Sequence, residues 1–158
     1  MSNWLEEIEI LLKSKTANFS TQEKENIQFE YLKNLLEKIE SEKLVIEPAL
    51  QTKIEYVINE IPIKTTEKRI DYKSKHINEL SNLQTIITQK FNFVKKGQYT
   101  RRYMPLGTVF GMSFGVPIAA AISKIALGPI IALPIGMIVG LLIGNRLDKK
   151  ARNENRVL

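Results

Sequence analysis

The pattern of apolar and polar residues changes near residue 100. Before that point, apolar residues recur every three or four positions among Lys, Glu, Asn and Gln, a spacing typical of amphipathic α-helices with one buried face. After it, residues 103–144 contain a single charged residue, Lys124, and show no polar face. The pattern therefore predicts an all-α protein with a water-soluble helical part and a separate apolar segment.

Four amphipathic helices are predicted before the change. The first covers about residues 2–15, the second begins at Ser20, and the third runs from Pro48 to Pro62. Ser20 and Glu23 have the spacing of a capping box, in which each side chain accepts a backbone N–H of the other residue. We expect the apolar faces to form the core of a small bundle, through Trp4, Leu5, Ile8, Leu11, Leu12, Leu32, Leu35, Leu36, Ile39, Leu50, Ile54, Val57, Ile58 and Ile61.

The fourth predicted helix is long, covering about residues 66–96. Its apolar seam has near-heptad spacing and comprises Ile70, Ile77, Leu80, Ile87, Phe91 and Val94, with Leu83 and Ile86 beside it. One interpretation is a helix that packs along the bundle and continues toward the apolar segment. The other is a self-associating stalk.

The apolar segment is too long for one membrane span. Its 42 residues would form a helix of about 63 Å, whereas the hydrocarbon core of a bilayer is about 30 Å thick. Two spans near residues 103–126 and 129–147, joined by a turn at Leu127-Gly128-Pro129, fit better, because Gly suits a helix end and Pro a helix start. A soluble helical hairpin is the alternative, but a soluble helix normally has a polar face.

Charge supports the membrane interpretation. Residues 1–100 have no net charge, and the whole excess of +6 lies in residues 101–158. Because basic residues flank the apolar segment on both sides, the positive-inside rule predicts a bacterial inner-membrane protein with two spans and both termini in the cytoplasm. The first ten residues contain Glu6, Glu7 and Glu9 and lack a basic n-region, so no signal peptide is expected. The residues expected to set topology or contact lipid headgroups are Lys95, Lys96, Arg101, Arg102, Lys124, Arg146, Lys149, Lys150 and Arg152. No nucleic-acid partner is expected.

Small residues occur at every fourth position of both spans. They are Gly107, Gly111, Gly115, Ala119 and Ser123 in the first, and Gly128, Ala132, Gly136, Gly140 and Gly144 in the second. Such spacing lets helix backbones approach closely in lipid. The hairpin could close on itself, with Gly111 opposite Gly144, Gly115 opposite Gly140 and Ala119 opposite Gly136. Alternatively, these faces could join subunits of a homo-oligomer.

The run from Gly128 to Lys150, with Pro134, Gly136, Gly140 and Gly144 inside it, resembles the bacterial glycine-zipper membrane-hairpin proteins. The resemblance covers roughly residues 101–152. It implies an inner-membrane helical hairpin with a tendency to oligomerise, and it implies no defined activity. Residues 1–95 resemble no family.

Little in the sequence points to catalysis. The absence of Cys and the single His exclude disulfides, thiolate metal sites and multi-histidine metal sites. Arg69 and His76 loosely match the Arg-then-His spacing of HEPN-type ribonucleases, but in a lysine-rich helix we expect a neutral, solvent-exposed His76. We therefore predict a protein that is not an enzyme and that binds no metal and no cofactor.

The predicted organisation is a cytosolic helical domain (1–97), a basic juxtamembrane linker (98–102), a transmembrane hairpin (103–147) and a basic cytosolic tail (148–158). Its expected partners are membrane lipids, further copies of the chain and a cytosolic protein bound through residues 1–95. The first functional hypothesis is a membrane-disrupting or pore-forming effector that oligomerises through the hairpin, similar to small effectors of antiphage defence. The second is a non-conducting membrane anchor or adaptor, and a remote third is a HEPN-like ribonuclease.

Overall fold

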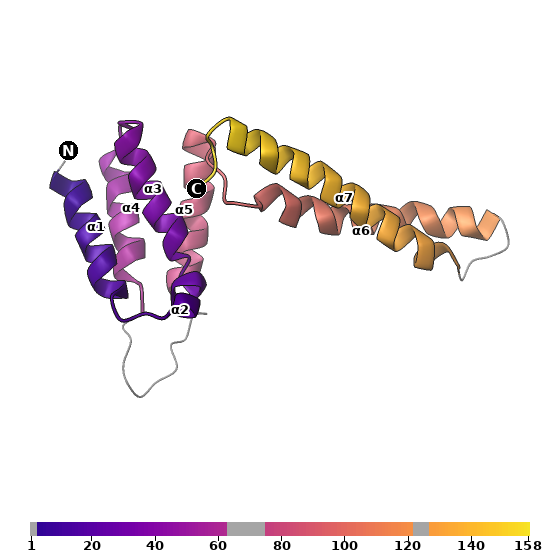
Figure 1. Ribbon diagram of the computed structural model, residues 1–158, viewed down its shortest axis with the longest axis horizontal. Coiled ribbons are helices and arrows are strands. Elements are labelled where there is room, and N and C mark those ends of the chain that lie inside the picture. The colour runs from indigo at the N-terminus through magenta and orange to yellow at the C-terminus, as the bar shows by residue number, and fades with distance from the viewer. Residues whose placement is uncertain (1–2, 63–74, 122–126) are drawn as a thin grey trace. The chain divides into compact units, whose positions relative to one another are not determined.

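The computed structural model describes residues 3–62, 75–121 and 127–158. These residues form seven α-helices and no strand, which confirms the predicted all-α fold. The chain divides into two compact units, residues 1–93 with Leu158 and residues 94–157. The first unit is a helical bundle and the second is a hairpin of two long helices (Figure 1).

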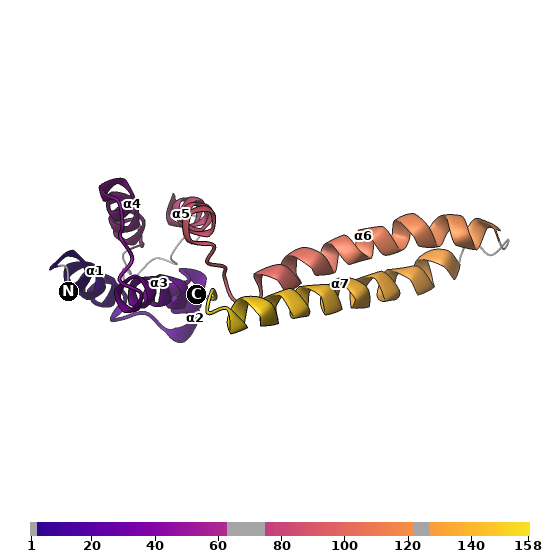
Figure 2. The same ribbon diagram turned by 90° about the horizontal axis from the view of Figure 1, so that it is seen from above.

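The bundle contains α1 (Asn3–Thr16), α2 (Thr21–Asn26), α3 (Phe29–Ser41), α4 (Pro48–Asn59) and α5 (Lys75–Phe91). Helix α1 packs against α3 and α4, and α4 packs against α5 (Figures 1 and 2). The predicted apolar faces supply the core, in which Leu12, Leu32, Leu35, Ile54, Val57 and Ile58 are almost completely buried. Burial of such side chains is the main force that holds a soluble bundle together.

The starts of α2 and α4 agree with the predicted helix starts, whereas an interruption between α2 and α3 was not predicted. Ser20 forms the capping box with Glu23 at the start of α2, and Pro48 is the first residue of α4. The second predicted helix, however, is interrupted between α2 and α3, because Gln28 adopts a left-handed conformation with φ of 56°. Because the helix stops here, the backbone carbonyl of Ile27 does not accept the hydrogen bond that a continuous helix would give it.

The long fourth helix is shorter at its C-terminal end than predicted. Helix α5 ends at Phe91, and the next residue, Asn92, has a positive φ of 58°. Leu80, Leu83 and Ile87 are completely buried in the bundle core, which agrees with a helix packed along the bundle. The predicted residues 66–74, with Ile70, lie outside the described residues.

The second unit consists of α6 (Gln98–Ala121) and α7 (Leu127–Asn153), which pack against each other along their length (Figures 1 and 2). Two predicted boundaries are corrected. Residues 98–102 are the first turn of α6 rather than a linker, and Leu127-Gly128-Pro129 begins α7 rather than forming the turn. The connection therefore falls in residues 122–126, which the structure does not describe.

Candidate membrane hairpin

The hairpin exposes large apolar side chains instead of burying them. Only 6% of the most apolar window of α6 and 17% of that of α7 is buried. Phe114 is 66% exposed and Ile130 67%. By length and composition both helices are candidate membrane spans, and a helix of 24 residues reaches about 36 Å. Apolar side chains on the outer surface match a lipid environment and leave only one helix face for internal contact.

The internal contact is made between backbones. A Cβ atom added to Gly107 would lie 2.8 Å from the Cα of Gly140, and one added to Gly136 would lie 2.8 Å from the Cα of Gly111. A Cβ on Gly144 would lie 2.5 Å from the Cα of Thr100. Real Cβ atoms essentially never approach other atoms below 3.0 Å. Only glycine fits at these positions, and five of the predicted small residues therefore contact the partner helix within one chain.

The register of these contacts differs from the predicted one. Gly111 lies opposite Gly136 rather than Gly144, and Gly140 lies opposite Gly107 rather than Gly115. Two rows of small residues with a spacing of four also match when one row is shifted by four or eight residues, so the spacing did not determine the register. The contacts between α6 and α7 show which of these registers the structure adopts.

The structure gives less information on the other predicted small residues. Ala119 is buried, Gly115 is half-buried, and the carbonyl oxygen of Ala132 faces Gly111. Gly128 is helical, but its surroundings are not described. The predicted residues Ser123 and Lys124 lie outside the described residues.

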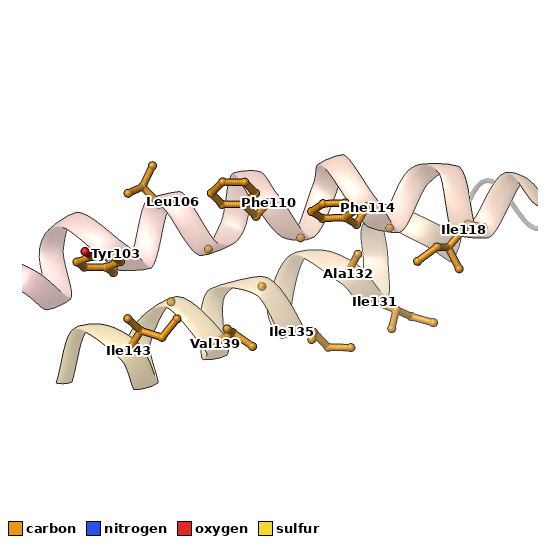
Figure 3. Close-up of a pocket in the computed structure, with 16 residues that line it drawn as sticks. Tyr103, Leu106, Phe110, Phe114, Ile118, Ile131, Ala132, Ile135, Val139 and Ile143 are labelled. Atoms are coloured by element: carbon orange, nitrogen blue, oxygen red, sulfur yellow. The ribbon is translucent and has the colours of Figure 1, made fainter. Parts of the chain in front are cut away.

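An apolar groove of about 710 Å³ runs along one side of the hairpin (Figure 3). Gly107, Gly111, Gly136 and Gly140 are among its lining residues. Its large side chains come from both helices and comprise Tyr103, Leu106, Phe110, Phe114 and Ile118 of α6 and Ile131, Ile135, Val139 and Ile143 of α7 (Figure 3). The groove can accept an apolar chain or helix, because its lining side chains are apolar apart from the hydroxyl of Tyr103.

A buried carboxylate joins the two helices at the open end of the hairpin. Asp148 of α7 is 6% exposed. Its oxygens accept the backbone N–H groups of Tyr99 and Thr100 at 3.0 Å each and the hydroxyl of Thr100 at 2.6 Å. The first amides of a helix lack intrahelical partners, so the carboxylate of α7 serves as the N-terminal cap of α6. Sequence reasoning missed this role, because Asp148 lies among surface-type Lys and Arg residues.

The predicted basic residues gather at the same end of the hairpin. Lys96, Arg101, Arg102, Arg146, Lys149, Lys150 and Arg152 are exposed. Lys95 is half-buried, and burial together with repulsion from the Arg101 guanidinium lowers its pKa. Because the last residues of α7 lie beside the first residues of α6, the charges before and after the apolar segment occupy one end of the unit.

The predicted exposure of His76 is wrong. Its side chain is completely buried, with Nδ1 2.9 Å from the carbonyl oxygen of Val57 and Nε2 3.2 Å from that of Ile27. Val57 lies in the last turn of α4 and Ile27 at the break after α2, where carbonyls lack helical partners. A neutral imidazole carries one N–H, so His76 can donate to one of these two carbonyls at a time. Arg69 lies outside the described residues.

No protein-family model, curated protein or solved structure matches this chain. The resemblance to glycine-zipper hairpins stays a prediction.

Proposed function

We propose that the protein is a two-span membrane anchor that holds its helical bundle at the cytoplasmic face of a bacterial inner membrane, where the bundle recruits a cytosolic protein. The observation that carries the proposal is the backbone contact of Gly107, Gly111, Gly136, Gly140 and Gly144 within one chain. Because these glycines already contact a helix of their own chain, the hairpin is closed without a second subunit.

The arrangement of charge supports the proposed topology. The basic residues before α6 and after α7 lie at one end of the hairpin, where Asp148 caps α6. Under the positive-inside rule that end is cytoplasmic, and both termini share its compartment. Fractionation of the untagged chain tests membrane placement. A protein found entirely in the high-speed supernatant would contradict it, as would protease access to the two termini from opposite faces of sealed vesicles.

The subunit number of the detergent-solubilised full chain tests the anchor itself. We expect a monomer by light scattering, with the same mass for Phe114→Ala, which alters the groove. A defined oligomer that the Phe114→Ala variant abolishes would contradict a self-sufficient anchor.

The groove favours a second candidate, an effector that assembles in the membrane. Its exposed apolar walls could accept a helix of another copy, so assembly would proceed through the groove and not through the glycines. Induced expression with a membrane-potential dye tests this function. Depolarisation that is lost in Phe114→Ala but kept in Val109→Ala, an exposed site outside the groove, would support the effector. An unchanged potential with the cytosolic partner present would reject it.

A further inference from the structure

A second, polar pocket lies at the open end of the hairpin. It has a volume of about 290 Å³ and lies between the first turn of α6 and the last turns of α7. Lys96, Arg101 and Arg152 bring three cations to its lining, and Asp148 is the one acidic residue there. The volume falls near the lower end of small-molecule sites, roughly 300–1,000 Å³.

The negative charge in this pocket is already engaged. Both oxygens of Asp148 accept hydrogen bonds from Tyr99 and Thr100. Within the residues that the structure describes, Lys96, Arg101 and Arg152 form no ion pair. The lining therefore carries three cations against one carboxylate, and the oxygens of that carboxylate already accept hydrogen bonds. This excess of positive charge favours the binding of an anion.

Backbone contacts hold the walls of the pocket in place. The C-terminal end of α7 closes with Asn155 at a φ of 55° and a hydrogen bond from the N–H of Arg156 to the carbonyl of Ala151, the geometry of a Schellman motif. The carbonyl of Arg156 then accepts the N–H of Val94 at 2.8 Å. The segments that carry Lys96 and Arg152 are thus tied together before any ligand arrives, which lowers the entropic cost of binding.

We propose that this pocket binds the phosphate of one anionic phospholipid headgroup, with Arg101 and Arg152 as the principal ligands and Lys96 as a third. A phosphate is recognised through charge-assisted hydrogen bonds, for which guanidinium groups are well suited. A lipid is the source rather than free phosphate, because Arg101 lies two residues before the apolar segment that starts at Tyr103, and the headgroups of anionic lipids concentrate at the membrane surface. The proposal rests on the membrane placement proposed above and is independent of subunit number.

Matched charge variants test the pocket. Arg101→Gln with Arg152→Gln removes two lining cations, and Arg102→Gln with Lys149→Gln removes two exposed cations that do not line it. The full chain is reconstituted in phosphatidylcholine nanodiscs with a minor fraction of phosphatidylglycerol, and the phosphatidylglycerol retained after extraction is measured by native mass spectrometry. We expect retention to fall about tenfold in the pocket pair and less than about threefold in the control pair.

Two further measurements distinguish lipid from free phosphate as the ligand and test the membrane placement by itself. Equal loss in both pairs, or retention with no preference for phosphatidylglycerol over phosphatidylcholine, would overturn the proposal. Inorganic phosphate is titrated onto the protein in neutral detergent. If it stabilises the wild type but not the pocket pair, while lipid retention is the same in all variants, the lipid source is wrong. Flotation with phosphatidylcholine vesicles tests membrane placement separately, because it needs no anionic lipid.

Discussion

The bundle and the hairpin use apolar side chains in opposite ways. In the bundle, Leu32, Ile54 and Leu80 point inward and are almost completely buried, as the hydrophobic effect in water requires. In the hairpin, Phe114 and Ile135 point outward, and the internal contact is between glycine backbones. In lipid, apolar burial gives no net gain, so close packing at small residues takes over. The side on which the large side chains lie thus distinguishes the two units, and it fits α6 and α7 as candidate membrane spans.

The two units resemble each other in how they pair the backbone groups at helix ends. In each unit, a buried titratable side chain contacts backbone groups at helix ends. His76 contacts carbonyls at two helix ends in the bundle, and Asp148 accepts amides at a helix start in the hairpin. Unpaired backbone groups are costly in either solvent, so both units use side chains to pair them.

The largest effect is expected from adding a side chain to the helix contact. Gly136→Leu would place atoms where the backbone of Gly111 lies, and backbone yields less than a side chain. We expect a loss of more than about 3 kcal/mol in hairpin closure, the upper end of typical overpacking costs. SDS titration in mixed micelles checks it, followed by the distance between spin labels at Val109 and Ile138, both exposed.

Ala120→Leu is the matched control for Gly136→Leu, since it adds similar bulk at an exposed site of α6. If both variants behave like the wild type, the glycine face is open to lipid and the hairpin is held together in another way.

Truncation of a large apolar side chain should cost more stability in the bundle than in the hairpin. Ile54→Ala opens a cavity in the bundle and should cost about 3 kcal/mol, whereas Ile135→Ala in the hairpin should cost less than about 0.5 kcal/mol. The single tryptophan, Trp4, packs against the bundle core, so its fluorescence during denaturation of the full chain reports the first variant. SDS titration reports the second. Equal costs would show that the outer face of the hairpin is buried.

Loss of the buried imidazole should have a smaller effect. His76→Leu leaves the carbonyls of Val57 and Ile27 without a side-chain partner, and we expect a loss of about 2 kcal/mol. His76→Gln keeps a donor and should recover part of that loss. Trp4 fluorescence measures both, and an unchanged stability in His76→Leu would mean that water replaces the ring.

The corresponding change in the hairpin removes the cap of α6. Asp148→Ala should cost about 1 kcal/mol, as the loss of an N-terminal cap typically does. Asp148→Asn keeps an acceptor and serves as the control. SDS titration is again the measurement, and equal stability of Asp148→Ala and the wild type would indicate that the cap is dispensable.

The smallest effect is a pH dependence confined to the bundle. The hydrogen bond from Lys53 lowers the pKa of Glu79 below its ordinary value of 4.5. The folded state therefore favours the charged carboxylate, and the contribution to stability is present above pH 4.5 and is lost as the pH falls further. The stability difference between wild type and Glu79→Gln should shrink below that pH. In a Lys53→Met background the difference should be small throughout, and a pH dependence retained there would assign the effect to another partner.

Much of the fold could be predicted from the sequence because its signals are local. Helical spacing, the Ser20 capping box and Pro48 each act within one or two turns. The apolar run of residues 103–144, with Lys124 as its single charge, separates the hairpin from the bundle. The spacing of the glycines likewise marked the face that the hairpin uses. None of these features requires knowledge of distant residues.

Tertiary structure alone decided the register of the hairpin and the roles of His76 and Asp148. A repeat of four residues is compatible with several registers, and only the contacts between the two helices show which one is adopted. His76 is buried because two distant helix ends present unpaired carbonyls to it, and Asp148 caps a helix that begins far earlier in the chain. Such contacts depend on where segments meet in space, which the pattern of residues along one helix does not contain.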